Sequence, residues 1–353
     1  MCSNCGIGRS WTGERHDMVI CMVTNMIPTR GDPGFGVFIK AQIDSIAAAG
    51  HEVTTLAIDG RASKKNYFRA VKQLNAILAA KKHDIVHAHY GLSGIPACVQ
   101  RHCPVVVSFC GDDLLGTSNG KGGYTFKGRL TVLASQFVAH HADAVIVKND
   151  KMLERLSSAS ARAKTVVIPN GVDFELFHPI DRLEARKKLG LEPFKKYVLF
   201  AGSPEAPVKR FDLADKAVEL LRGSFTDVEI IVLHRKPQAE VPVYMNACDV
   251  VILTSDSEGS PNVIKEAMAC NTPIVSVDAG DAWQLIGGAE QCHRAEREPG
   301  DLASKVKRVL QAAEPSDGRR RIGHLELPAV AARVIAVYET VLADARRRMR
   351  PGP

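Results

Sequence analysis

The sequence contains little that would mark a membrane-spanning, secreted or fibrous protein. No stretch of its 353 residues approaches the run of about 20 apolar residues that a membrane-spanning helix needs. The first seventeen residues lack the apolar centre of a signal peptide. Nine cysteines are too sparse at this length for a disulfide-rich scaffold, and their odd number fits a reducing compartment. We therefore expect a soluble, cytoplasmic protein with free thiols.

The composition has no extreme either. With 45% hydrophobic and 24% charged residues, the chain is unlike collagen, coiled coils and disordered proteins. Its length exceeds the about 100–200 residues of a typical domain, which predicts two domains. The formal charge of +7 is modest, and the basic residues are scattered apart from runs at 319–321 and 346–350. Such runs are usually solvated helix ends, with contact between the C-terminal run and an anionic membrane as the alternative.

Short runs rich in Val and Ile alternate with longer stretches of helical periodicity, which is typical of parallel strands joined by crossover helices. The runs that we expect to be strands are 18–25, 51–58, 84–90, 104–110, 144–148, 165–168, 197–201, 228–234, 250–255 and 273–278. Two doubly wound α/β domains are the simplest arrangement of these units. We expect a disordered leader at 1–17, domains at 18–175 and 180–325, and a closing helix at 328–345 that could pack on either domain.

The segment after the run at 250–255 is the densest in polar residues. Ser260 is expected to cap a helix whose first turn contains Pro261, so that the free N–H groups of this turn face the carboxyl edge of the sheet. Open α/β sheets bind ligands at this edge, and a helix N-terminus attracts anions. Glu258 precedes the helix and Glu266 lies on it, where carboxylates could accept hydrogen bonds from sugar hydroxyls. The alternative is an ordinary capped helix with two solvated glutamates.

This segment resembles the E-x7-E region of glycosyltransferase family 4, a family of retaining, nucleotide-sugar-dependent enzymes with the GT-B fold. The resemblance runs from about residue 19 to 342, in the family's order and spacing, through Gly50–Val53, Asp84–His89, Ile168–Pro179, Phe200–Asp212 and Val337–Glu339. It implies two Rossmann-like doubly wound parallel-sheet domains that face a central cleft, with the last helix returning to the first domain. It also implies transfer of a hexose-type sugar from a nucleoside-diphosphate sugar to an acceptor hydroxyl, with retention of configuration and without a metal or other cofactor.

By the same resemblance, Lys209 and Glu258 are the catalytic residues. Lys209 would lie at the donor diphosphate, where a fixed cation stabilises the charge that grows as the glycosidic bond breaks. Glu258 would lie beside the transferred sugar as an electrostatic partner, and Glu266 would bind the nucleotide ribose. The other donor-binding residues that the resemblance implies are Gly34, Gly36, Arg210, Gly259, Ser260, Pro261, Asn262 and Val263.

Two positions depart from the family pattern. Ser203 stands where many members carry a second diphosphate-binding arginine, and Arg210 is a candidate substitute. Cys110 stands where many members have a histidine beside the transferred sugar, and a thiol is a weaker hydrogen-bond partner than imidazole. The alternative for Cys110 is a small buried residue. The residues implied on the sugar and acceptor side are Cys110, Gly111, Asp112 and Asp113.

Other interpretations stay open. A degenerate GT-B protein that only binds a nucleotide sugar would explain both departures, and nucleotide-sugar epimerases share the GT-B architecture. A metal site is not favoured, because His87 and His89 lack a third ligand at suitable spacing, and Cys2 and Cys5 lack a second pair. Nucleic-acid binding is not expected. The expected partners are the nucleotide-sugar donor and an acceptor, which in relatives is a lipid-linked saccharide, a cell-surface polysaccharide or a natural product.

Overall fold

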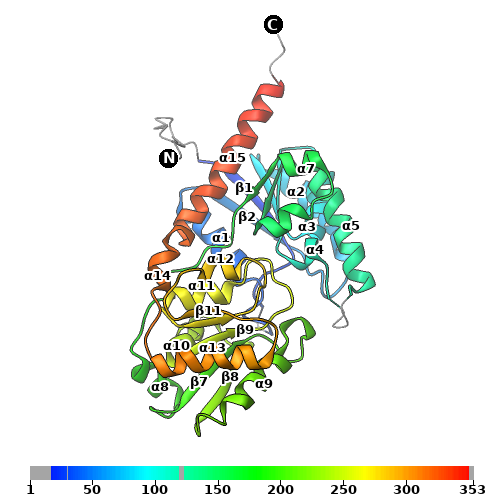
Figure 1. The fold of residues 1–353 in the computed structure, drawn as a ribbon. Coiled ribbons are helices and arrows are strands. Elements are labelled where there is room, and N and C mark those ends of the chain that lie inside the picture. The colour runs from blue at the N-terminus through cyan, green and yellow to red at the C-terminus, as the bar shows by residue number, and fades with distance from the viewer. Residues whose placement is uncertain (1–16, 30, 119–122, 350–353) are drawn as a thin grey trace, which may run out of the picture.

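The computed structural model describes residues 17–29, 31–118 and 123–349. Across these residues the strands form two parallel sheets, one of six strands in the order β2-β1-β3-β4-β5-β6 and one of five in the order β11-β10-β9-β7-β8. The two sheets lie in separate halves of the molecule, each flanked by helices (Figure 1). This confirms the predicted pair of doubly wound α/β domains. The leader, with Cys2 and Cys5, falls outside the described residues apart from its last position.

The strands follow the Val and Ile runs of the sequence. The first sheet consists of β1 (Val19–Thr24), β2 (Glu52–Ala57), β3 (Ile85–His89), β4 (Val105–Ser108), β5 (Ala144–Val147) and β6 (Thr165–Val167). The second consists of β7 (Lys196–Ala201), β8 (Val228–Leu233), β9 (Val250–Leu253), β10 (Ile274–Ser276) and β11 (Cys292–Arg294). Strands such as β5 and β9 are buried along their whole length, which explains why their sequences are uninterrupted apolar runs. Strand β3 is equally buried but contains His87 and His89.

Helices connect these strands. Those around the first sheet are α1 (Val37–Ala48), α2 (Lys65–Ala80), α3 (Gly91–Val99), α4 (Asp112–Leu115), α5 (Phe126–His141), α6 (Asp150–Glu154) and α7 (Ala159–Ala163). Those around the second are α8 (Arg182–Leu189), α9 (Phe211–Leu221), α10 (Val241–Ala247), α11 (Asn262–Ala269), α12 (Ala282–Ile286), α13 (Pro299–Ala312) and α14 (Gly318–Arg321). Short 3-10 turns are η1 (Pro207–Lys209), η2 (Gln238–Glu240) and η3 (Gly323–Leu325), and the chain then enters α15 (Leu327–Met349).

The last helix, α15, runs along the first sheet rather than the second (Figure 1). The hydroxyl of Tyr338 on α15 lies 2.6 Å from His87 Nδ1 on β3, and Arg333 donates a hydrogen bond of 2.7 Å to the carbonyl of Val167 on β6. These contacts tie the C-terminal end of the described chain to the core of the first sheet. The residue limits of the domains stay a prediction.

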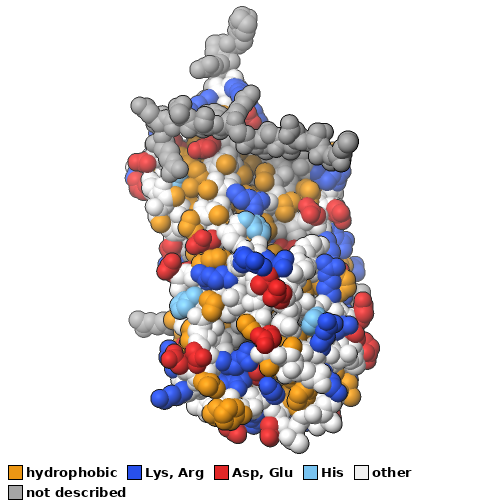
Figure 2. Space-filling view, turned by 60° about the vertical axis from the view of Figure 1, so that its left-hand side comes forward, with side chains coloured by type: hydrophobic (Ala, Val, Ile, Leu, Met, Phe, Trp, Pro, Cys, Tyr) orange, Lys and Arg blue, Asp and Glu red, His pale blue; other side chains and the backbone are white. Residues whose placement is uncertain are grey.

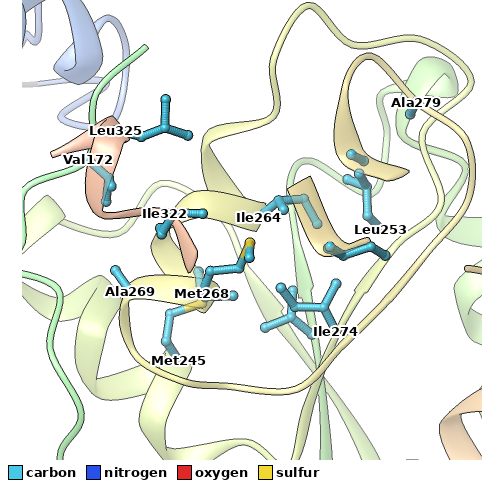
Figure 3. Packing of buried hydrophobic residues seen from close by; sticks show 14 of the residues in the cluster. Val172, Met245, Leu253, Ile264, Met268, Ala269, Ile274, Ala279, Ile322 and Leu325 are labelled. Atoms are coloured by element: carbon cyan, nitrogen blue, oxygen red, sulfur yellow. The ribbon is translucent and has the colours of Figure 1, made fainter. Parts of the chain in front are cut away.

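A continuous hydrophobic core joins the two halves. The side chains between the first sheet and α1 and α15 belong to the same buried cluster as the core of the second sheet, and Val172 of the linker is part of it. The N–H of Val172 donates to the carbonyl of Leu325 at 2.9 Å, and Figure 3 shows these residues side by side. Because the linker is packed into this core, the carboxyl edges of the two sheets are held facing each other.

Candidate functional site

The carboxyl edges of the two sheets meet in a seam of direct contacts. Asn149, which follows β5, donates a side-chain hydrogen bond to the carbonyl of Gly259 in the loop after β9. Lys151 Nζ lies 2.8 Å from Asp278 Oδ1, which follows β10. A Cβ atom added at Gly259 would come within 2.5 Å of the carbonyl oxygen of Cys110, beyond the end of β4. This close approach of two backbones requires glycine at position 259.

The two residues predicted to be catalytic form an ion pair beside this seam. Lys209 ends the turn η1 after β7, and Glu258 lies in the loop after β9, the neighbouring strand. Their Nζ and Oε1 atoms are 2.6 Å apart, and both side chains are partly exposed. An anion that arrives at Lys209 would compete with Glu258 for the ammonium group, so the pair can open when a ligand binds.

Ser203, at the position where many family members have an arginine, and Arg210, the candidate substitute, both bind carboxylates in the free protein. The Ser203 hydroxyl lies 2.5 Å from Glu205 Oε2. Arg210 has a left-handed backbone with a φ of 52° and pairs with Asp212 at 3.0 Å and Asp256 at 3.2 Å. A role of Arg210 at the phosphates would therefore need these ion pairs to rearrange, and that role stays a prediction.

The start of α11 differs from the prediction. The helix begins at Asn262, and its N-cap residue is Pro261, which supplies no side-chain cap. Ser260, predicted to be the cap, instead donates its hydroxyl to Asp281 Oδ2 at 2.8 Å and accepts from Lys265 Nζ at 3.0 Å. The physical reason is that the side chains of Asp281 and Lys265 are buried and need hydrogen-bond partners. The N–H groups at the start of α11 lie at the proposed ligand site, where a ligand can accept their hydrogen bonds.

Glu266 lies on α11 at the edge of a cavity of about 200 Å³. Gln238 Nε2 donates to its Oε1 at 3.3 Å, and on the same side of α11 Asn262 Oδ1 accepts from Asn170 at 3.2 Å. Burial raises the pKa of Glu266 to about 7. The cavity is also lined by residues of α1 and of the linker, among them Lys40, Asp44, Asp173 and Leu176. Paired acceptors in a small cavity suit vicinal hydroxyls, whereas Val263, also predicted to bind the donor, is packed against the core.

The glycine-rich loop after β1 reaches the second domain. Gly36 has a φ of 73°, and a Cβ atom there would lie 2.3 Å from the carbonyl of Met26, so the loop requires glycine at this point. Gly34 lies opposite the backbone of Lys236, which follows β8; its Cβ position would be 3.9 Å from that carbonyl. The loop therefore lies against the segment that follows β8, and its donor-binding role stays a prediction.

The segment after β4 contains two neighbouring carboxylates, a buried one on Asp113 and an exposed one on Asp112. Asp113 is buried, and its oxygens accept hydrogen bonds from the backbone N–H groups of Cys110, Gly111 and Gly91, at 2.8–3.1 Å. Asp112 is exposed. Burial raises the pKa of the Cys110 thiol far above its ordinary value, so the thiol is neutral. Asp113 therefore shapes the loop, and Asp112 is the carboxylate that a ligand can reach.

The sequence analysis missed two buried lysines at the seam. Lys265 lies on the inner side of α11, and Lys148, only 2% exposed, follows β5. In the described part of the chain Lys148 has no hydrogen bond or ion pair. It borders a cavity of about 590 Å³ between the two halves, whose lining includes Asn149, Asp281, Gln284 and His324. The available signal was a lysine directly after the apolar run of β5.

Lys148 provides a test of this buried charge. We expect Lys148→Met to raise the free energy of unfolding by about 1–3 kcal/mol, because it removes an unpaired buried ammonium group and keeps the volume. Burial also lowers the pKa of Lys148, in line with this cost. Urea denaturation measures the difference, with Lys72→Met, at an exposed lysine of α2, as the matched control. A less stable Lys148→Met variant would mean that the ammonium group has a partner in solution.

The sequence predicted neither a metal site nor a membrane-spanning helix, and the described residues can be examined for both. Within the described ranges, no cluster of three or more His, Cys, Asp or Glu side chains could hold a metal ion. His87 is instead hydrogen-bonded to Tyr338 and, at 2.8 Å, to Ser108. Among the helices of the same ranges, none is long and apolar enough to cross a membrane.

Comparison with known families assigns both halves. The glycosyl transferase 4-like domain model matches residues 7–171, and the model of the glycosyl transferases group 1 matches residues 195–312. The chain belongs to the family 4-like glycosyltransferases with the GT-B fold. This confirms the family that the motifs indicated.

Individual relatives are glycosyltransferases of distant sequence. A D-inositol 3-phosphate glycosyltransferase of Mycobacterium marinum is 30% identical over 233 residues, which cover 56% of this chain and 49% of that protein. The chain thus spans about half of that relative. The putative teichuronic acid biosynthesis glycosyltransferase TuaC of Bacillus subtilis is 25% identical over 333 residues, which cover 76% of this glycosyltransferase and 83% of TuaC.

Solved structures show the same fold. A sucrose-phosphate synthase from Thermosynechococcus elongatus superposes with a TM-score of 0.76 at 18% identity, covering 93% of this chain and 100% of that one. HepE from Anabaena, in complex with UDP and glucose, superposes with a TM-score of 0.65 at 17% identity, covering 92% of this chain and 100% of that one. At these identities the likeness establishes the fold alone, and it confirms the GT-B architecture.

Proposed function

We propose that this glycosyltransferase moves a hexose-type sugar from a nucleoside-diphosphate sugar to an acceptor hydroxyl, with retention of configuration. The observation that carries the proposal is the ion pair of Lys209 and Glu258 at the seam, on the same sheet edge as Glu266. Because the HepE structure holds UDP and glucose, uridine nucleotides are the first donors to test. The proposed acceptor belongs to cell-envelope polysaccharide, glycolipid or natural-product synthesis. The relatives' names, which refer to D-inositol 3-phosphate and to teichuronic acid biosynthesis, make these two kinds of acceptor the first to test.

In the proposed reaction the donor diphosphate displaces Glu258 from Lys209. The bond between the anomeric carbon and the diphosphate oxygen breaks, and Lys209 stabilises the negative charge that develops on that oxygen. The released Glu258 carboxylate stabilises the positive charge at the anomeric carbon. The acceptor oxygen bonds to this carbon on the face that the diphosphate leaves, and its proton passes to the departing diphosphate. The charge of Lys209 lets the reaction proceed without a metal.

Three outcomes separate this function from its rivals. Thermal-shift measurements with nucleoside diphosphates identify the base, because a ligand of the folded state raises the apparent stability. Incubation of the matching nucleotide sugar with an acceptor panel, followed by NMR of the anomeric proton, should give a product with the donor's configuration. A C2 epimer formed without acceptor would identify an epimerase. Nucleotide binding with neither transfer nor hydrolysis would identify a degenerate binding protein.

Glu266 predicts how nucleotide binding depends on pH. The ribose hydroxyls donate to an ionised carboxylate, and burial raises the pKa of Glu266 to about 7. Nucleotide affinity should therefore fall as the pH drops below about 7, by up to tenfold per pH unit. Titration calorimetry from about pH 5.5 to 8.5 measures this dependence. Glu266→Gln should bind more weakly at high pH and show no such dependence, whereas an unchanged profile would remove Glu266 from the ribose site.

The Glu266 carboxyl group should affect the stability of the nucleotide-free protein in the opposite direction, so that stability falls as the pH rises. Because the pKa of Glu266 is higher in the folded than in the unfolded chain, folding favours the protonated carboxyl. Its contribution to stability is fully present below the unfolded pKa and is lost as the pH rises through about 7. Nucleotide binding and free-protein stability should thus respond to this carboxyl in opposite directions.

A further inference from the structure

Helix α5 carries its large apolar side chains on its outer side. They repeat at intervals of three and four residues and so form one stripe about 16 Å long. Their exposed fractions are 76% for Phe126, 50% for Leu130, 66% for Leu133 and 54% for Phe137. In Figure 1, α5 forms the outer edge of the first half of the molecule. A surface helix of a globular protein normally turns such a stripe towards the core.

The inner side of α5 explains why the stripe cannot turn inward. Its buried residues are Gly128, Ser135, Val138 and Ala139, which are mostly small. The facing helix α3 presents glycines, so that a Cβ atom added at Gly91 would lie 1.9 Å from Ser135 Oγ and one at Gly94 2.4 Å from Val138 Cγ1. This close packing has no room for phenylalanine or leucine. The apolar stripe is therefore a fixed feature of the surface.

The surroundings of the stripe are basic. Residues 123–142, which include α5, and residues 155–164, which include α7, contain no Asp or Glu; the bordering acidic residues are Asp143, which pairs with Arg348, and Glu154. Their five basic residues are Lys127, Arg129, Arg155, Arg162 and Lys164. The two segments are in contact, because the Ser157 N–H donates to Gln136 Oε1 at 3.0 Å. The face shown in Figure 2 differs, since acidic and basic side chains are interspersed on it.

We propose that α5, through the stripe Phe126, Leu130, Leu133 and Phe137 and the basic residues around it, docks on an anionic lipid bilayer. An apolar stripe bordered by Lys and Arg suits the interface of such a bilayer, where apolar side chains enter the acyl boundary and basic ones meet anionic headgroups. A second copy of this chain is a poorer occupant, because a two-fold contact would set the same basic surface against itself.

Two neighbouring elements, α15 and the loop that contains Asp112, lie at the two ends of this docking surface. Arg348 on α15 lies 3.4 Å from Asp143, directly after α5, so the basic end of α15 lies at the C-terminal end of the stripe. At the other end, the N–H of Thr125 donates to the carbonyl of Thr117 at 2.9 Å, next to the loop with Asp112. A docked bilayer would thus lie near the acceptor side; this last step alone rests on the proposed function.

Vesicle sedimentation tests the proposal. The full chain should sediment with vesicles of phosphatidylcholine and phosphatidylglycerol in equal amounts, much less with phosphatidylcholine alone, and less as NaCl rises from about 0.05 to 0.5 M. The double variant Phe126→Ser with Leu133→Ser should bind roughly tenfold or more weakly. The matched control is Leu183→Ser with Phe194→Ser, which removes two exposed apolar side chains from the second half. Stabilisation by UDP checks that each variant is folded and tests the nucleotide site separately.

Each outcome decides the question. Selective loss of vesicle binding in the α5 variant, with thermal unfolding and UDP stabilisation unchanged, supports the docking surface even if no transfer is ever detected. Equal binding of the α5 variant and the control variant overturns it, as does failure of the unmodified chain to bind anionic vesicles. A dimer in size-exclusion chromatography that the α5 variant dissociates would assign the stripe to a second copy instead.

Discussion

Lys209→Ala should lower kcat by about 10²–10³-fold, the typical effect of removing one group that stabilises developing charge. Lys209 Nζ lies 2.6 Å from Glu258 Oε1 at the seam, and in the proposed mechanism this ammonium group meets the departing diphosphate. The nucleotide dissociation constant should change by less than about tenfold, because Glu266 and the loop after β1 remain. Steady-state kinetics with saturating donor, together with titration calorimetry, separate the two effects.

The ion pair also predicts how substitutions of the two proposed catalytic residues combine. Without Lys209, the carboxylate of Glu258 is left facing the diphosphate and repels it. The double variant Lys209→Ala with Glu258→Gln should therefore lose less activity than the product of the single losses. Lys216→Ala, an exposed lysine of α9, is the matched control and should keep full activity. Strictly multiplicative losses would show that Lys209 and Glu258 do not act on the same charge.

The sequence predicted the fold well because burial on both faces of a parallel strand leaves a strong signal. Runs such as those of β5 and β9 consist of Ala, Val, Ile and Leu, and the structure places both strands inside the sheets, fully buried and with a neighbouring strand on each side. The edge strand β11 was missed because its residues, Cys-His-Arg, contain no such run and pair with β10 alone. Helix α5 begins at Phe126, where the Thr125 side chain caps it by accepting a hydrogen bond from the N–H of Gly128.

The candidate site was predictable only where it is local in sequence. The motifs identified Lys209, Glu258 and Glu266, but not which of these side chains pair in the free protein. Contacts across the seam, such as that between Asn149 and Gly259, depend on how the two sheets face each other, which no periodicity encodes. The error at Ser260 has the same origin, because its partner Asp281 is distant in sequence.

The contact between the sheets leads to the second large expected effect, that of Gly259→Ala. The new Cβ atom would meet the Cys110 carbonyl at 2.5 Å, and this neighbour is backbone that cannot turn aside. The two halves must then separate to relieve the clash. Since a displacement of about 1 Å in a reacting geometry can cost 10²-fold in rate, we expect kcat to fall by about 10²-fold.

The proposed nucleotide site predicts which measurement should change less than the turnover in Gly259→Ala. Gln238 and Glu266 stay on the second sheet's side of the seam, whereas the loop after β1 moves away with the first half, so UDP should bind no more than about tenfold more weakly. Small-angle X-ray scattering with UDP bound should show a larger radius of gyration for Gly259→Ala than for the unmodified protein. Gly223→Ala, where the added atom would be 3.6 Å from its nearest neighbour, is the matched control. A normal kcat for Gly259→Ala would contradict this prediction. It would mean that the Cys110–Gly259 contact opens during catalysis, and that the reaction takes place with the halves further apart than they are in this structure.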